Sequence, residues 1–236
     1  MNTSLWVRRA TLIAALAAAS LASGTAGATP YTTYTLTFDG AICDGGVACT
    51  NSSLIDQTYG DVPGVIDVVY DRNVGLDTSG SDAARLRFWA TGYSDLTNVA
   101  WGGTSDTAGT AEIFLDPAPG YRVQLNSFDL GAWPAASPGT MPGTIDTAFS
   151  ILDGSSNLYF SSGSLAISKG PHESFVFGHL ANDSGFRIQW GPSAYDVGID
   201  NLTFTVDSTT VPEPATIALF GLGLAGLGFS LRRKRA

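Results

Sequence analysis

The feature that most constrains the fold is a succession of short β-branched and aromatic runs, separated by Gly, Asp, Asn, Ser and Pro. No apolar stripe of helical period and length accompanies them in residues 29–208, so helices are not expected there. We predict an all-β domain over 29–208, an antiparallel β-sandwich of the jelly-roll type. The runs span residues 31–38, 65–70, 85–90, 110–115, 121–130, 146–152, 158–160, 173–177, 185–190 and 198–206.

The run 121–130 carries a finer signal. Val123 and Leu125 alternate with polar neighbours, but Phe128 and Leu130 fall on the opposite parity. An apolar face that changes parity needs one extra residue in the strand, which is a β-bulge. The sequence therefore predicts a bulge at Asn126-Ser127.

The N-terminal segment has the organisation of a secretory signal. Arg8 and Arg9 precede an apolar stretch at 10–22, and small residues follow at Ala26-Gly27-Ala28. A short basic region, an apolar region and a small-residue cleavage site predict a signal peptide over 1–28, cut after Ala28. The chain is therefore expected to be exported.

The C-terminal segment, 209–236, has three parts in a fixed order. The tripeptide Pro-Glu-Pro comes first, a charge-free run over 215–231 follows, and a basic cluster ends the chain. As a helix the run would be roughly 25 Å long, enough for a transmembrane span near the lower limit, with the cations staying on the cytoplasmic side. The motif is Val211, Pro212, Glu213 and Pro214, and the basic tail is Arg232, Arg233, Lys234 and Arg235.

This C-terminal arrangement resembles a PEP-CTERM sorting signal, which bacterial exosortases recognise on exported proteins. The resemblance implies exosortase as a processing partner acting near 212–214. It also implies a precursor anchored in the inner membrane by its C-terminal helix, and a later place in the cell envelope, on the outer surface or outside the cell. Association with exopolysaccharide is part of what the resemblance implies. Whether the tail is cleaved, replaced or retained stays open.

The charge of the predicted domain limits its partners. Between the two end segments lie six basic and 20 acidic residues, a difference of −14. Nucleic acid is excluded as a partner because phosphate binding needs a basic face. Of the acidic residues 18 are Asp, which favours turns and oxygen ligands for cations.

The run 195–206, with Ile-Asp-Asn at 199–201, resembles the closing strand of galactose-binding-like jelly rolls, the fold of many carbohydrate-binding modules. Some modules of that group hold a structural calcium between the first and last strands. The resemblance implies Asp39 and Asp200 as Ca²⁺ ligands, and Asp44 lies near enough in sequence to add an oxygen. Alternatively, Asp200 only caps a loop beside packing residues.

The chain has two cysteines, Cys43 and Cys49. In an exported protein such a pair predicts a disulfide. Zinc is disfavoured because further ligands would have to come from His172 and His179. These two residues bracket one predicted strand and would be about 20 Å apart.

Four tryptophans lie within 29–208. Trp101 and Trp133 precede Gly-Gly and Pro, so we expect them in loops, where exposed rings suit sugar stacking. Burial under a loop is the competing interpretation. Trp89 and Trp190 lie in apolar runs and are expected in the core.

No nucleophile elbow, zinc-protease motif, phosphate-binding loop or Cys-x-x-Cys motif is present, so the chain is expected not to be an enzyme. The leading interpretation is an envelope or extracellular-matrix protein whose β-domain is a structural or interaction module associated with exopolysaccharide or envelope proteins. A carbohydrate-binding module, with or without structural calcium, is the alternative. A secreted hydrolase using paired carboxylates is the third.

Overall fold

The computed structural model describes residues 31–73, 76, 82–103, 109–137, 139 and 141–209. The predicted signal peptide, sorting motif, transmembrane run and basic tail lie outside these residues. Residues 30–209 form one compact unit. Within the described ranges no helix is long and apolar enough to cross a membrane.

The described residues form thirteen strands and no helix, and every strand pairing is antiparallel. The strands are β1 (Thr32–Leu36), β2 (Ile66–Asn73), β3 (Asp82–Arg85), β4 (Arg87–Tyr93), β5 (Leu96–Trp101), β6 (Thr110–Pro117), β7 (Tyr121–Ala132), β8 (Thr144–Asp153), β9 (Leu158–Ser161), β10 (Leu165–Ser168), β11 (Glu173–Asn182), β12 (Phe186–Gly191) and β13 (Val197–Ser208).

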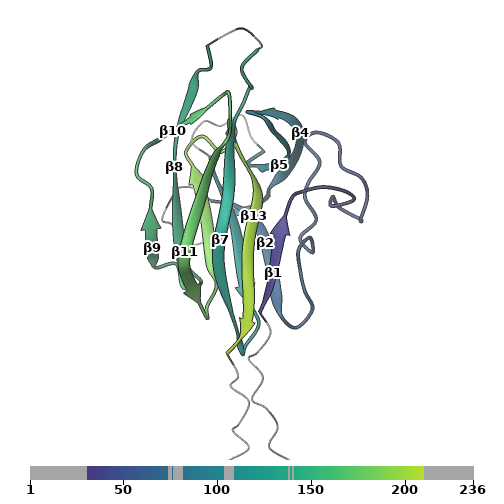
Figure 1. The fold of residues 1–236 in the computed structure, drawn as a ribbon. Coiled ribbons are helices and arrows are strands. Elements are labelled where there is room, and N and C mark those ends of the chain that lie inside the picture. Colours follow the sequence, from purple (N-terminus) through teal and green to yellow (C-terminus); the bar gives the residue numbers. More distant parts are fainter. Residues whose placement is uncertain are drawn as a thin grey trace, which may run out of the picture. The chain divides into compact units, whose positions relative to one another are not determined.

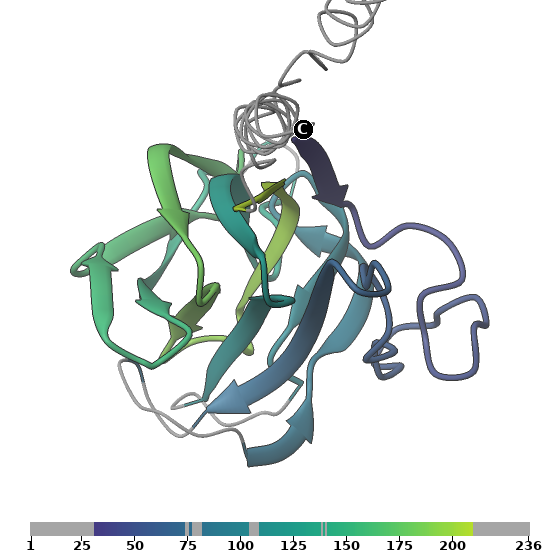
Figure 2. The same ribbon diagram turned by 90° about the horizontal axis from the view of Figure 1, so that it is seen from below.

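The strands make two sheets that face each other (Figures 1 and 2). The first has the order β11-β7-β13-β5-β4, with β1 also paired to β13. The second has the order β10-β8-β12-β6-β2-β3, with β9 also paired to β8. The predicted all-β, antiparallel sandwich is confirmed. Each of the ten predicted runs overlaps a strand, and β3, β5 and β10 are additional.

The core lies between the sheets and is rich in aromatic rings. Trp190, Phe128, Phe149, Phe186 and Phe204 are among its largest fully buried side chains. Alternation explains their placement, because every second residue of a strand faces the other sheet.

The predicted bulge in β7 is also present. Ser127 pairs with Thr203 of β13, but Leu125 pairs with the next residue, Phe204, so Asn126 is the extra residue. The bulge lets Leu125 and Phe128 both face the core although they differ in parity. The parity change seen in the sequence therefore marks a real change in the ladder.

A long loop after β1 covers one side of the sandwich and contains the predicted disulfide. Cys43 and Cys49 are bonded, with their Cα atoms 5.3 Å apart. Arg85 holds the same loop by donating to both carboxylate oxygens of Asp44, at 2.6 and 2.5 Å. Two residues of the loop itself, Ile42 and Ile55, are buried in the core and attach the loop to it.

Cys43→Ser is expected to lower the free energy of unfolding by about 2 kcal/mol, the chain-entropy value for a loop this short. Cys49→Ser and the double variant should lose the same amount, because all three variants remove one cross-link. Chemical denaturation of the oxidised protein measures these losses. A double variant that loses twice the single value would show that the side chains, rather than the bond, stabilise the loop.

Candidate functional site

An aromatic depression lies at one end of the sandwich, opposite the two ends of the described chain. Strands β7 and β13 pair along their length, from Tyr121 with Ser208 at one end to Ala132 with Val197 at the other. Strand β1 also starts at the Ser208 end, where Thr32 pairs with Val206. The twelve residues of β13 separate the two ends of the sandwich by roughly 36 Å.

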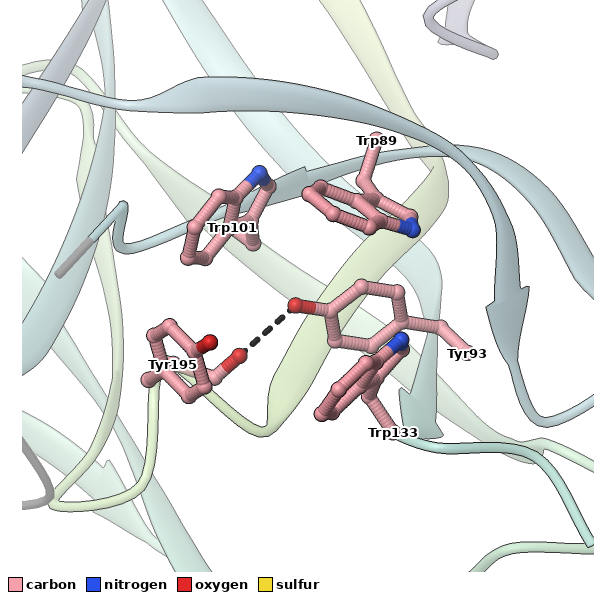
Figure 3. Close-up of a pocket in the computed structure, with 5 residues that line it drawn as sticks. All are labelled: Trp89, Tyr93, Trp101, Trp133 and Tyr195. Carbon is pink, nitrogen blue, oxygen red and sulfur yellow. Dashed lines mark hydrogen bonds between the residues drawn. The ribbon is translucent and has the colours of Figure 1, made fainter. Parts of the chain in front are cut away.

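Five aromatic side chains from four segments line the depression (Figure 3). Trp89 and Tyr93 come from β4, Trp101 ends β5, Trp133 follows β7, and Tyr195 precedes β13. The rings meet edge to face, with centroids 5.7 Å apart for Trp89 and Trp101, and 5.2 Å apart for Trp101 and Tyr195. Trp133 closes the circle of side chains, because its ring centroid lies 6.3 Å from that of Trp89 and 6.2 Å from that of Tyr195. Such contacts add to the stability gained from burial.

Two of the five rings form the floor. Tyr93 is 2% exposed and Trp101 is 5% exposed. The Tyr93 hydroxyl donates to the Tyr195 carbonyl at 2.6 Å, and Trp101 Nε1 donates to the Phe88 carbonyl at 3.2 Å. Because their polar atoms are already engaged, these rings support the depression and fix its shape.

The other three rings, Trp89, Trp133 and Tyr195, are half-buried and form the rim. The hollow between the rings encloses about 10 Å³, the space of roughly one water molecule. Among the described residues, the indole N–H groups of Trp89 and Trp133 have no hydrogen-bond partner. The site is therefore a shallow aromatic surface with two free donors.

Charged groups stand close to this surface. Burial and, after it, the nearby Asp196 carboxylate raise the pKa of the Tyr93 hydroxyl, so this carboxylate lies close to the floor of the depression. Burial raises the pKa of the Asp196 carboxyl, and the positive charge of Lys169 partly offsets this rise. The depression thus has the Asp196 carboxylate beside it, and Lys169 lies close enough to that carboxylate to interact with it.

The structure brings the predicted pair Trp101 and Trp133 together but corrects two expectations. Trp101 is buried at the end of β5 and is not an exposed loop residue. Trp89, expected in the core, is half-buried in the depression itself. Trp190 is fully buried, as expected, and its Nε1 donates to the Val197 carbonyl at 2.9 Å.

Apart from the aromatic depression, a cluster of polar side chains surrounds Asp200 on the first sheet. Asp200 of β13 pairs in register with Asp129 of β7, and Asn201 Nδ2 donates to Asp129 Oδ2 at 2.8 Å. Asn98 of β5 donates to the carboxylate of Asp39. His172 Nε2 lies 3.7 Å from Asp129 Oδ2.

The structure separates the three predicted calcium ligands. Asp39 and Asp200 are close enough to interact electrostatically, whereas Asp44 is engaged by Arg85. No group of three His, Cys, Asp or Glu side chains placed to hold a metal ion occurs within the described ranges. The calcium site stays a prediction, with Asp39 and Asp200 as its remaining residues.

Asp200 is only 5% exposed, and its burial raises its pKa to about 7. The neighbouring charges of Asp129 and Asp39 also raise it, while the Asn201 N–H and His172 lower it. An unfolded Asp releases its proton near pH 4, so between about pH 4 and 7 the folded chain binds more protons than the unfolded chain. This carboxyl therefore lowers stability as the pH rises through that range.

Asp200→Asn should remove this loss, because the amide stays neutral and still offers an oxygen to the Asn201 N–H. Measured by denaturation with chelator present, the free energy of unfolding of the variant relative to the parent should rise between about pH 5 and pH 8. A relative stability that does not change with pH would contradict the raised pKa.

Comparison with known proteins places one segment of the chain in a family. Residues 210–234 match the model of the PEP-CTERM protein-sorting motif, as the Pro-Glu-Pro tripeptide, apolar run and basic end predicted. No curated protein is significantly similar to the chain in sequence.

Several solved structures are distantly similar to the chain. An arabinose-bound GH51 α-L-arabinofuranosidase shares 11% identity, with 75% of this chain and 31% of that chain covered and a TM-score of 0.33. A mutant of the family 29 carbohydrate-binding module CBM29-2 shares 16% identity, with 60% and 92% covered and a TM-score of 0.28. The C-terminal family 22 carbohydrate-binding module of Clostridium thermocellum Xyn10B shares 12% identity, with 74% and 88% covered and a TM-score of 0.27.

The chain spans less than a third of the length of the arabinofuranosidase chain. Its own family signal is the C-terminal motif, which indicates a precursor held at a membrane. This chain is therefore an exported protein that carries a PEP-CTERM sorting motif and passes through a membrane-anchored precursor.

Proposed function

We propose that the β-domain binds a glycan of the exopolysaccharide at its aromatic depression, as a module of the cell envelope or extracellular matrix. One observation carries the proposal: the half-buried rings of Trp89, Trp133 and Tyr195 surround a shallow hollow. The carbohydrate-binding alternative thus has a site to support it, and the structural role in the matrix follows from it.

The chemistry of the depression suits a sugar ring. The C–H face of a pyranose packs against flat aromatic rings, and its hydroxyls need hydrogen-bond donors and acceptors nearby. Trp89 and Trp133 offer two N–H donors, and the Asp196 carboxylate, with Lys169 nearby, lies close to Tyr93. Because the hollow is shallow, the sugar would lie across it, which is the mode open to an internal unit of a long chain.

The same geometry supports binding over hydrolysis. Paired-carboxylate hydrolysis needs two carboxyl groups flanking the scissile bond, about 5 to 10 Å apart. All five residues that line the depression are aromatic, and the hollow cannot enclose a sugar. These features favour a non-catalytic role.

The position of the depression fits a protein attached through its C-terminus. The chain continues from the Ser208 end of β13 toward the sorting motif, and the depression lies at the other end of that strand. A domain attached through the Ser208 end of β13, before or after processing by exosortase, has its aromatic rings at the end away from the attachment point. The proposed final location is the envelope, the outer surface or the extracellular matrix.

Trp89→Ala and Trp133→Ala are each expected to weaken binding to exopolysaccharide from the producing organism by about tenfold, equal to roughly 1.4 kcal/mol per ring. The measurement is retention of the full chain on the immobilised polysaccharide, with calcium and with chelator. Retention that is kept with calcium but lost with chelator would implicate Asp39 and Asp200 in the binding as well.

Tyr31→Ala is the matched control, because it removes an exposed aromatic ring that does not line the depression. It should retain full binding, and the thermal melts should show that all three variants are folded. Equal retention of the parent and both tryptophan variants would refute the proposed site.

A further inference from the structure

Strand β9 exposes an apolar surface at the edge of the second sheet. All four of its residues are exposed, including Leu158 at 53%, Tyr159 at 52% and Phe160 at 43%. Among the described strands β9 pairs with β8 alone, so its outer backbone edge carries no ladder. Side chains and backbone groups are thus both available on this strand.

The exposed rings continue into the core. The Phe160 ring centroid is 5.6 Å from that of Phe149 and 6.1 Å from that of Phe177, which lies on β11, the edge strand of the first sheet. The Tyr159 centroid is 5.6 Å from that of the buried Phe186. Strands β9 and β11 therefore lie on the same side of the sandwich (Figure 1), and we call Leu158, Tyr159, Phe160 and Phe177 the open edge.

This edge lacks two of the usual protections against pairing with another strand, charged side chains and proline. Natural edge strands are commonly guarded by charged side chains or proline. Residues 154–168, which contain β9 and β10, include no charged residue and no proline. Two copies that meet along this segment bring none of its side chains into charge repulsion, whereas most other contacts in a domain with six basic and 20 acidic residues would bring like charges together.

We propose that the open edge binds a second copy of this chain, with β9 of one copy pairing antiparallel with β9 of the other about a two-fold axis. An antiparallel pair of identical strands is two-fold symmetric, so the surface is complementary to itself. It is also uncharged in both copies, which removes the repulsion that the acidic domain otherwise imposes. Pairing would extend the second sheet across the interface and cover Tyr159 and Phe160.

The local structure favours a closed pair over a fibre. Strand β9 is four residues long, and Gly163 after it has a φ of +66°, which interrupts the edge before β10 begins. A short, interrupted edge accepts one partner strand of its own length. Such a dimer would carry two aromatic depressions, which would raise its avidity for a glycan chain. Formation of the dimer does not depend on that binding.

Site-directed cross-linking of the full chain in the producing cells tests the pairing. The chain's two native cysteines are bonded to each other, so an introduced cysteine is the single free thiol. Leu158→Cys, Tyr159→Cys and Phe160→Cys place it along β9, and Met141→Cys is the control at a side chain that is 94% exposed in a loop. On mild oxidation the β9 variants should give disulfide-linked dimers, most at the position nearest the two-fold axis. Equal cross-linking of the control and the β9 variants would overturn the proposal.

The mass of the detergent-solubilised full chain gives an independent measurement. The parent should be dimeric by sedimentation equilibrium. Tyr159→Lys should raise the dissociation constant of the dimer at least tenfold, because each copy then carries a cation into the interface. Met141→Lys should stay dimeric, and thermal melts should show both variants folded. A monomeric parent, or a dimer that Tyr159→Lys leaves intact, would overturn the proposal.

Discussion

The pairing of β7 with β13 is the interaction on which the rest of the structure depends. Strand β13 is the last of the described strands, yet it lies inside the first sheet between β7 and both β1 and β5. The β7–β13 ladder sets Asp200 beside Asp129, and β1 pairs along the other side of β13. At its far end, Ala132 pairs with Val197, and this pair directs Trp133 and Tyr195 toward the β4–β5 hairpin. Without this long-range ladder, neither the polar cluster nor the depression would be assembled.

The sequence predicted the sandwich well because alternation and turn residues are local signals. It predicted the bulge at Asn126 for the same reason, since parity can be read within one run. Strand β5 was missed because its turn from β4 consists of Ser94 and Asp95, where Ser94 takes a positive φ of 52° without glycine. Strand β10 is four residues long and its alternation is too brief to distinguish from a loop.

The candidate site was only partly predictable, because its residues meet through tertiary structure. Gly102-Gly103 after Trp101 indicated a loop. In the structure Trp101 is the last residue of β5, and its ring is buried beneath the depression. Alternation placed Trp89 on one face of a strand but cannot tell which face another element covers. Tyr93 and Tyr195 are 102 residues apart, and no local pattern indicates that the hydroxyl of one bonds the carbonyl of the other.

The acidic charge of the domain connects the two proposed surfaces. An excess of 14 negative charges disfavours contact with anionic polymers and with other copies over most of the surface. Both surfaces depart from that charge, since the depression is lined by aromatic rings alone and residues 154–168 carry no charge. Under the two proposals, the surfaces that bind a glycan and a second copy are those with little charge, while the charged remainder of the domain repels other copies.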